Sequence, residues 1–208
     1  MVKSTFTGKS TVDTIRNYAE MLIDDVNGNQ PESLSSHWNK AREMDNATAK
    51  KIFSQEYGDR IGAAYFNCVK NYKISELKKC WKNKIKIDVN YNVVLKLADA
   101  KLMEIIDLIE FGFSMAPKSS DLHCAAAWAY IVHMGRGEPD NKKVAKLLPE
   151  ALYKSYRDLA ISHLSQASHL SPNSQMVMRV KGKLESLDRK KVGGGCFIAT
   201  AAYGTPFA

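Results

Sequence analysis

The sequence predicts an all-α fold, a helical bundle that continues into antiparallel helix hairpins. Apolar residues recur at helical spacing through most of the 208 residues. The breakers are few, with 12 Gly and 6 Pro, and most of them fall between the periodic segments. One segment alternates like a strand, but it has no partner strand, and an isolated strand is not stable. Many capped helices and no sheet indicate an all-α class.

Five helices are expected in the N-terminal part. The first covers residues 11–27, capped by Ser10 or Thr11 and ended by Gly28. Pro31 precedes the second, and Asn46 is expected to cap the third. A fourth follows Gly58, and a fifth covers residues 74–84. The inward positions of the second to fifth helices, read from the helical period, are Leu34, Trp38, Ala41, Met44, Ile52, Phe53, Ile61, Tyr65, Cys68, Val69, Ile74, Leu77, Cys80 and Trp81.

The alternating segment Lys84–Val94 is interpreted as an extended connector into a long helix that ends near Met115. Further helices are expected over residues 120–134, 150–170 and 174–190. In the first of these, Ala125, Ala126, Ala127 and Ala129 would let neighbouring helices pack closely. The expected organisation is an N-terminal bundle over 1–90, helix hairpins over 91–190 and a tail over 191–208.

Charge and cysteine usage limit the function classes. The 30 basic and 22 acidic side chains give a formal charge of +8, which favours anionic partners and also serves solubility alone. No two of the four cysteines have C-x-x-C spacing, and the N-terminus lacks a secretory apolar region, which together indicate the cytoplasm. The apolar stretch Val93–Phe113 contains six charged side chains, so no membrane span is expected.

A spacing pattern recurs in the C-terminal half. Ala160, Leu164, Ala167 and Pro172 follow one another at intervals of four, three and five residues, and Ile105, Ile109, Gly112 and Pro117 repeat these intervals. The following helices place Ala127, Tyr130 and Gly182 at related positions. The pattern resembles a tetratricopeptide repeat, which implies stacked helix hairpins with a concave groove that binds a protein partner. The two prolines are 55 residues apart, so an irregular helical bundle remains the alternative.

The C-terminal tail has a different composition from the rest of the chain. Residues 192–208 carry no charge, and a run of three glycines precedes Cys196-Phe197-Ile198-Ala199-Thr200-Ala201-Ala202-Tyr203-Gly204. This motif resembles the CFI-box, a C-terminal module attached to many otherwise unrelated bacterial proteins, tetratricopeptide proteins among them. Two roles stay open, an apolar anchor that docks or self-associates, and a site of modification or proteolytic processing. The candidate residues are Gly194, Gly195, Cys196, Phe197, Ile198 and Tyr203.

A basic cluster supports a rival function. Seven lysines lie between Lys70 and Lys86, opposed only by Glu76, and Tyr72 and Trp81 are interleaved with them. Such a cluster can neutralise phosphates while aromatic rings stack on bases. The alternatives are a solvated lysine face and a core position for Trp81. The candidate polyanion-binding residues are Lys73, Lys78, Lys79, Lys82, Lys84 and Lys86.

No catalytic or metal site is expected. Gly8-Lys9-Ser10 lacks the upstream glycine of a phosphate-binding loop, and the five histidines show no metal-ligand spacing. A Cys124–His163 pair is the single candidate for covalent catalysis, and sequence does not bring it together. The expected function is a non-enzymatic, cytoplasmic adaptor or scaffold of bacterial type without a cofactor. The alternative is a module that binds nucleic acid or another polyanion.

Overall fold

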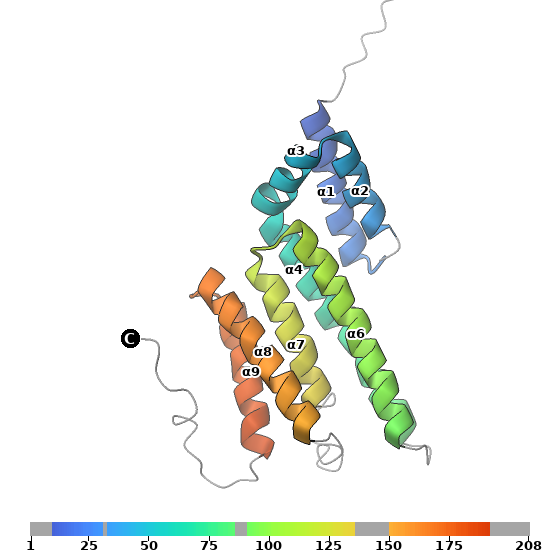
Figure 1. The fold of residues 1–208 in the computed structure, drawn as a ribbon, viewed down its shortest axis with the longest axis vertical. Helices are drawn as coiled ribbons and strands as arrows, with labels where there is room; N and C mark the ends of the chain where they lie inside the picture. Colours follow the sequence, from blue (N-terminus) through green and yellow to red (C-terminus); the bar gives the residue numbers. More distant parts are fainter. Residues whose placement is uncertain (1–9, 31–32, 86–90, 136–149, 192–208) are drawn as a thin grey trace, which may run out of the picture.

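The computed structural model describes residues 10–30, 33–85, 91–135 and 150–191. Within these ranges the chain is helical and contains no strand, which confirms the all-α class (Figure 1). The elements, with η marking π-helical turns, are α1 (Thr11–Asn27), α2 (Leu34–Met44), α3 (Asn46–Lys51), η1 (Ile52–Glu56), α4 (Gly58–Cys68), η2 (Val69–Lys73), α5 (Ile74–Ile85), α6 (Tyr91–Met115), α7 (Ser120–Gly135), α8 (Glu150–Leu170) and α9 (Gln175–Lys191).

The helix ends follow local capping chemistry. The Oγ of Ser10 accepts a hydrogen bond from the backbone N–H of Asp13 at 3.1 Å, and Gly28 is the C-cap of α1. The predicted cap of α3 was wrong by one residue. Asp45, not Asn46, is the N-cap, and its Oδ1 accepts from the backbone N–H groups of Ala47 and Thr48. A carboxylate that accepts two such bonds is a stronger cap than an amide.

Most predicted inward positions of the N-terminal part are buried. Met44 was predicted wrongly, because it lies at the end of α2 with 44% of its surface exposed. Cys80 is half-buried. Trp81 is only 2% exposed, which confirms the core interpretation of this residue.

The connector predicted over Lys84–Val94 is wrong at both ends. α5 continues to Ile85 and α6 already begins at Tyr91, so residues 86–90 remain between them. Tyr91 and Leu95 continue the spacing of Ala98, Leu102 and Ile105 along α6. β-branched residues have a helical propensity only slightly lower than that of the best helix formers. A segment in which they alternate with polar residues can therefore still form part of a helix that is stabilised by tertiary packing.

The helices from α4 onward form two layers. α4, η2 and α5 make one continuous run that is parallel to α7, and α9 is parallel to α7 on its other side. α6 and α8 run antiparallel to α7 and are joined to it in hairpin fashion. Packed pairs fix these directions, since Gly62 faces Ser119, Gly135 faces Leu187, and the Oγ of Ser120 donates to the carbonyl of Ala167. Figure 1 shows α6, α7 and α8 side by side, with α4 behind α6 and α9 behind α8.

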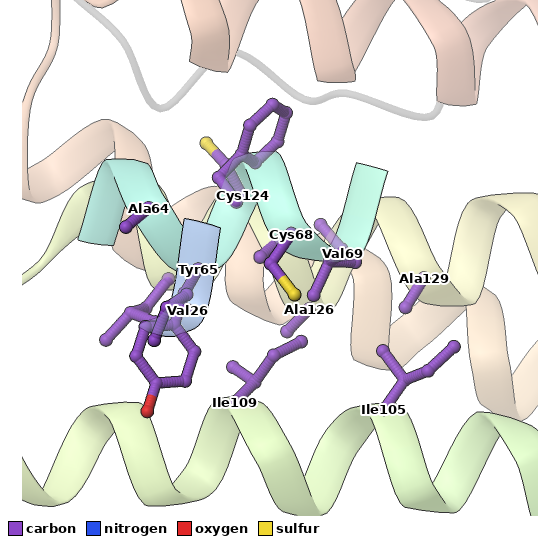
Figure 2. Close-up of a cluster of buried hydrophobic side chains, with 14 of the residues drawn as sticks. Val26, Ala64, Tyr65, Cys68, Val69, Ile105, Ile109, Cys124, Ala126 and Ala129 are labelled. Carbon is purple, nitrogen blue, oxygen red and sulfur yellow. The ribbon is translucent and has the colours of Figure 1, made fainter. Parts of the chain in front are cut away.

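α7 is the central helix of this part of the molecule. It contacts α4, α5, α6, α8 and α9, and its four alanines are almost fully buried, as predicted. Figure 2 shows Ala126 and Ala129 of α7 beside Cys68 and Val69, with Ile105 and Ile109 of α6 facing them. Small side chains bring the helix axes close together at this point.

Two glycines mark the closest approaches. A Cβ on Gly62 would lie 1.9 Å from the Oγ of Ser119, and a Cβ on Gly112 would lie 2.8 Å from a methyl group of Leu122. A Cβ at either position would therefore require a neighbouring side chain at the α4–α7 or the α6–α7 contact to shift. Gly62 and Tyr65 also have the three-residue interval of Ala127 and Tyr130, a further instance of the pattern that sequence reasoning missed.

The positions of the recurring pattern are buried on α6 and α8 but exposed at Gly182 on α9. Ala160, Leu164 and Ala167, and likewise Ile105, Ile109 and Gly112, all lie in the core. Gly182 was assigned to an equivalent small position, but it is exposed and a Cβ there would meet nothing within 4 Å. None of the described helices packs against α9 at Gly182, so no helix contact there requires a small residue.

The N-terminal helices are joined to the rest through α1. The guanidinium of Arg60 on α4 donates two hydrogen bonds to the Glu20 carboxylate, at 2.6 and 2.5 Å, and the Nε of Arg16 donates to Glu56 at 2.9 Å. The buried apolar cluster continues from Ile15 to Leu184. The domain boundary near residue 90 stays a prediction.

Candidate functional site

A stack of aromatic and histidine rings follows α7 on the side between α6 and α8. We call it the ring ladder. Successive ring centroids lie 4.6 to 6.1 Å apart, within the range of stacked and tilted ring contacts. In order, the members are Phe113, His123, His163, Tyr130, Tyr156, His133 and Trp81.

Helical periodicity builds the ring ladder. His123 and Tyr130 are seven residues apart on α7, as are Tyr156 and His163 on α8, so each pair occupies one stripe two turns long. Because α7 and α8 are antiparallel, the pairs meet in reverse order. The spacing within each helix was visible in the sequence, but the register that joins the two stripes was not.

His123 and His163 contact each other at one end of the ladder. Their Nδ1 atoms are 3.1 Å apart, so one ring donates its Nδ1–H and the other accepts with an unprotonated Nδ1. The Phe113 ring lies 4.6 Å from His123 and is stacked on His163 at 6.4 Å. Tyr130 also stacks on His163, at 6.1 Å.

The environment of this pair disfavours positive charge. Burial, together with the charge of His163, lowers the pKa of His123 to about 4. Burial also lowers the pKa of His163, against an opposing effect of the nearby Glu110 carboxylate. Both imidazoles are therefore neutral at pH 7.

A second titratable group lies at the other end of the ladder. His133 is fully buried, and its Nε2 lies 2.9 Å from the Oδ1 of Asp99, although the N–H direction is not aligned with this oxygen. The Tyr156 hydroxyl donates to the same oxygen at 3.0 Å. Burial raises the pKa of Asp99, but its hydrogen bonds and the charge of His133 outweigh this effect and leave the pKa below its usual range.

The proposed covalent pair is not assembled. The Nδ1 of His163 lies against His123 rather than Cys124. Burial, together with the charge of Asp121, raises the pKa of the Cys124 thiol to about 12, which leaves it protonated at pH 7. A cysteine nucleophile needs the opposite shift.

Ser33, Asp25 and His37 are the residue types of a serine hydrolase triad, but their contacts follow a different order. The Ser33 hydroxyl donates to the Asp25 carboxylate at 2.5 Å, and the Nε2 of His37 lies 2.8 Å from the same oxygen. In a hydrolase the serine must contact the imidazole, which then removes its proton. Here the carboxylate lies between the two side chains, so this group ties α2 to α1.

The opposite face of α7 is partly open. We call Asp121, Trp128 and Val132 the outer strip, because a helical turn of 3.6 residues places them across the helix from His123 and Tyr130. All three are half-buried. Burial raises the pKa of Asp121, and the charge of Asp59 on α4 raises it further. In the ranges that the structure describes, neither carboxylate has an ion-pair partner.

The basic cluster is placed on η2 and α5. Lys70 and Lys79 are exposed, Lys73 and Lys78 are half-exposed, and Tyr72 is 42% exposed. Among the described residues these four lysines have no ion pair, because Glu76 lies 3.7 Å from the Nζ of Lys101 instead. The other predicted polyanion-binding side chains, Lys82, Lys84 and Lys86, lie outside the described residues.

The tail motif also lies outside the described residues. This covers Gly194, Gly195, Cys196, Phe197, Ile198 and Tyr203. Within the described part of the chain, no three histidine, cysteine or acidic side chains are grouped to hold a metal ion. None of the helices described is long and apolar enough to cross a membrane.

One shallow pocket lies on the outside of α8. It is lined by Ala151, Lys154, Ser155, Asp158 and Leu159, all from a few turns of one helix. A small-molecule site normally encloses most of its ligand between several elements. This pocket does not enclose a ligand, so it does not indicate a small-molecule substrate.

Comparisons with protein-family models, curated proteins and solved structures gave no match for this chain.

Proposed function

We propose that the protein is a non-enzymatic adaptor of bacterial type that binds a protein partner in the cytoplasm. The observation that carries the proposal is the outer strip of α7, where Asp121 and the adjacent Asp59 lack a basic partner among the described residues beside a half-buried Trp128. A carboxylate whose pKa burial and a like charge raise is stabilised by a cation. A partner segment with Lys or Arg beside an apolar residue matches this surface.

Trp128 adds to the match. Its indole N–H is buried and has no hydrogen-bond partner in the described part of the chain. Tryptophan is enriched among the residues that dominate binding energy at protein interfaces. The resemblance to tetratricopeptide repeats, which bind peptides or partner proteins on a concave face, supports the same class of function.

The test compares variants in a pull-down from cells that express the natural gene. Asp121→Asn removes the charge with little change in volume, and Asp107→Asn on the exposed side of α6 is the matched control. We expect specific partners to be lost from Asp121→Asn and kept by Asp107→Asn, with helical circular dichroism unchanged in both. Identical partner sets for the two variants would contradict the proposal.

For the tail, we propose that Cys196–Gly204 docks, is modified or is processed. The support is the nine-residue resemblance to the CFI-box and its position after a glycine run. Full-length protein and a form that ends at Lys191 are compared in the same pull-down, together with the mass of the tail. If both forms retained the same partners and the full-length protein had the mass of an unmodified, uncleaved chain, the tail would neither dock, be modified nor be processed.

A second candidate function, polyanion binding, rests on the unpaired lysines of η2 and α5 beside exposed Tyr72. We expect Lys73→Gln, Lys78→Gln and Lys79→Gln together to weaken binding to single-stranded RNA. The slope of log affinity against log salt should fall by about 2, because each lost phosphate contact contributes about 0.7.

The matched control for this measurement replaces three exposed lysines elsewhere, Lys40, Lys50 and Lys51, with glutamine. It removes the same net charge but leaves the cluster intact. Equal slopes for the two triple variants would show that net charge alone attracts RNA. No retention of RNA at low salt would rule the function out.

A further inference from the structure

We propose that His123 and His163 bind a divalent transition-metal ion of the zinc class, which clamps α7 to α8. The two Nδ1 atoms come from different helices and lie 3.1 Å apart. In tetrahedral zinc sites the Zn–N distance is about 2.0–2.1 Å, which puts two ligand nitrogens about 3.3–3.4 Å apart. An increase of a few tenths of an ångström, loss of the bridging proton and a rotation of both rings that aims the two Nδ1 lone pairs at a common point would turn this hydrogen-bonded pair into a pair of ligands.

The surrounding rings hold both imidazoles in place. Phe113 contacts the two histidine rings, and Tyr130 stacks on His163. Phe113 comes from α6, Tyr130 and His123 from α7, and His163 from α8, so three helices meet at the pair. Ligands that are already oriented lose little conformational freedom when the ion binds, and this lowers the cost of binding.

The protonation state suits a metal ion. An imidazole binds metal only when one ring nitrogen is unprotonated, so protons compete with the ion. The Nδ1–Nδ1 contact at 3.1 Å already requires one of these two nitrogens to be unprotonated, so at least one of the two rings is in the form that binds a metal ion. Both side chains are half-buried rather than enclosed, so an ion can reach them from solvent.

Glu110 supplies the negative charge near the pair. Its carboxylate, on an exposed position of α6, acts electrostatically on His163 and on Tyr130. No third protein ligand is held in place within the described residues, so water and a rotated Glu110 would complete the coordination. Two fixed imidazoles favour Zn²⁺, Ni²⁺ or Cu²⁺ over Mg²⁺ and Ca²⁺, which prefer oxygen ligands.

The other histidine contacts fit an ion less well. The His133–Asp99 contact is closed to solvent on the histidine side, since His133 has no exposed surface. His37 is buried and contacts Asp25. Among the described histidine contacts, the His123–His163 pair is the one that brings two imidazole nitrogens together.

The experiment measures the thermal unfolding midpoint of the full chain with micromolar Zn²⁺, with EDTA and with Mg²⁺. The visible spectrum of the Co²⁺ form reports the ligands directly. His123→Gln and His163→Gln each remove one ligand, and His169→Gln on the exposed side of α8 is the matched control. Helical circular dichroism checks that each variant is folded.

We expect Zn²⁺ to raise the midpoint of the wild type and of His169→Gln, EDTA to reverse the rise, and Mg²⁺ to have no effect. Either ligand variant should lose at least about tenfold in apparent affinity, a loss of about 1.4 kcal/mol. A wild type that shows neither a midpoint shift nor a Co²⁺ spectrum would overturn the proposal. Equal zinc binding by both ligand variants would also overturn it, and would assign the ion to the thiols.

Discussion

Gly112→Ala is expected to destabilise the protein, whereas Gly182→Ala is expected to stabilise it. At Gly112 the new Cβ would lie 2.8 Å from a Leu122 methyl group and 3.2 Å from the Tyr65 ring, where α4, α6 and α7 meet. Overpacking of this kind costs about 1–3 kcal/mol. It outweighs the gain of about 0.5–1 kcal/mol that alanine brings to a helix interior. At Gly182 nothing lies within 4 Å, so only that gain remains.

Urea unfolding of the two single variants and the wild type measures both effects. The two changes add the same atoms to a helix, so their difference reports the packing around Gly112 alone. Additivity in the double variant is the internal control, because distant sites without shared partners add. If Gly112→Ala proved as stable as the wild type, the close approach of α6 to α7 and Tyr65 would be wrong.

The same pair of glycines shows where sequence reasoning stopped. Both were assigned to small positions of one repeating pattern. Whether a small residue is required depends on a helix that packs against it, and spacing along one chain does not say whether that helix exists. Gly112 has such neighbours in α4 and α7, and Gly182 faces solvent.

Helix positions were the most predictable part of the fold. The helix over residues 11–27 was predicted to the residue, because an N-cap serine and a C-cap glycine enclose a clear apolar period. The prediction of an extended connector over Lys84–Val94 is wrong at both ends, because the alternation of apolar residues in so short a segment does not distinguish a strand from a helix. Local signals therefore place helices well where caps and periodicity agree.

The ring ladder could be predicted only in part. Seven-residue spacing between His123 and Tyr130, and between Tyr156 and His163, places each pair on one stripe. The contact between His123 and His163 joins residues 40 positions apart. This contact depends on which stripe of α8 faces α7 and on the register between the two helices. The other helices that pack against α7 and α8 determine the facing stripe and the register.

Acid is expected to destabilise the protein through the same two histidines. Burial and His163 lower the pKa of His123 from 6.5 to about 4 in the folded state. A lowered folded-state pKa means that the unfolded state binds the proton more readily, so stability is lost as pH falls from about 6.5 towards 4. His163 shifts in the same direction. Since His123 is about half-buried, solvent screening reduces the expected loss to about 1–2 kcal/mol.

Other titratable groups near His123 and His163 also change the stability of the protein as the pH falls, so the experiment must separate their effects from that of His123. Glu110 on α6 opposes the effect by favouring charged His163. Asp121 on α7 has a raised pKa and so gains stability in acid, while Asp99 on α6 has a lowered pKa and loses it. Stability curves of the wild type therefore mix several titrations. His123→Phe removes one of them and keeps a ring against Phe113, and His169→Gln is a control outside the ladder.

The measured quantity is the slope of the free energy of unfolding against pH between 6.5 and 4, the range that the pKa of His123 defines. We expect a shallower slope for His123→Phe than for the wild type and for His169→Gln. A total loss of about 1–2 kcal/mol over this interval corresponds to a mean slope difference of about 0.4–0.8 kcal/mol per pH unit, below the limit of about 1.4 kcal/mol per pH unit that uptake of a full proton gives. Parallel curves for all three proteins would mean that His123 is solvated, and the contact with His163 would then not persist in solution. A confirmed difference would also set the pH above which the pair is free to bind metal.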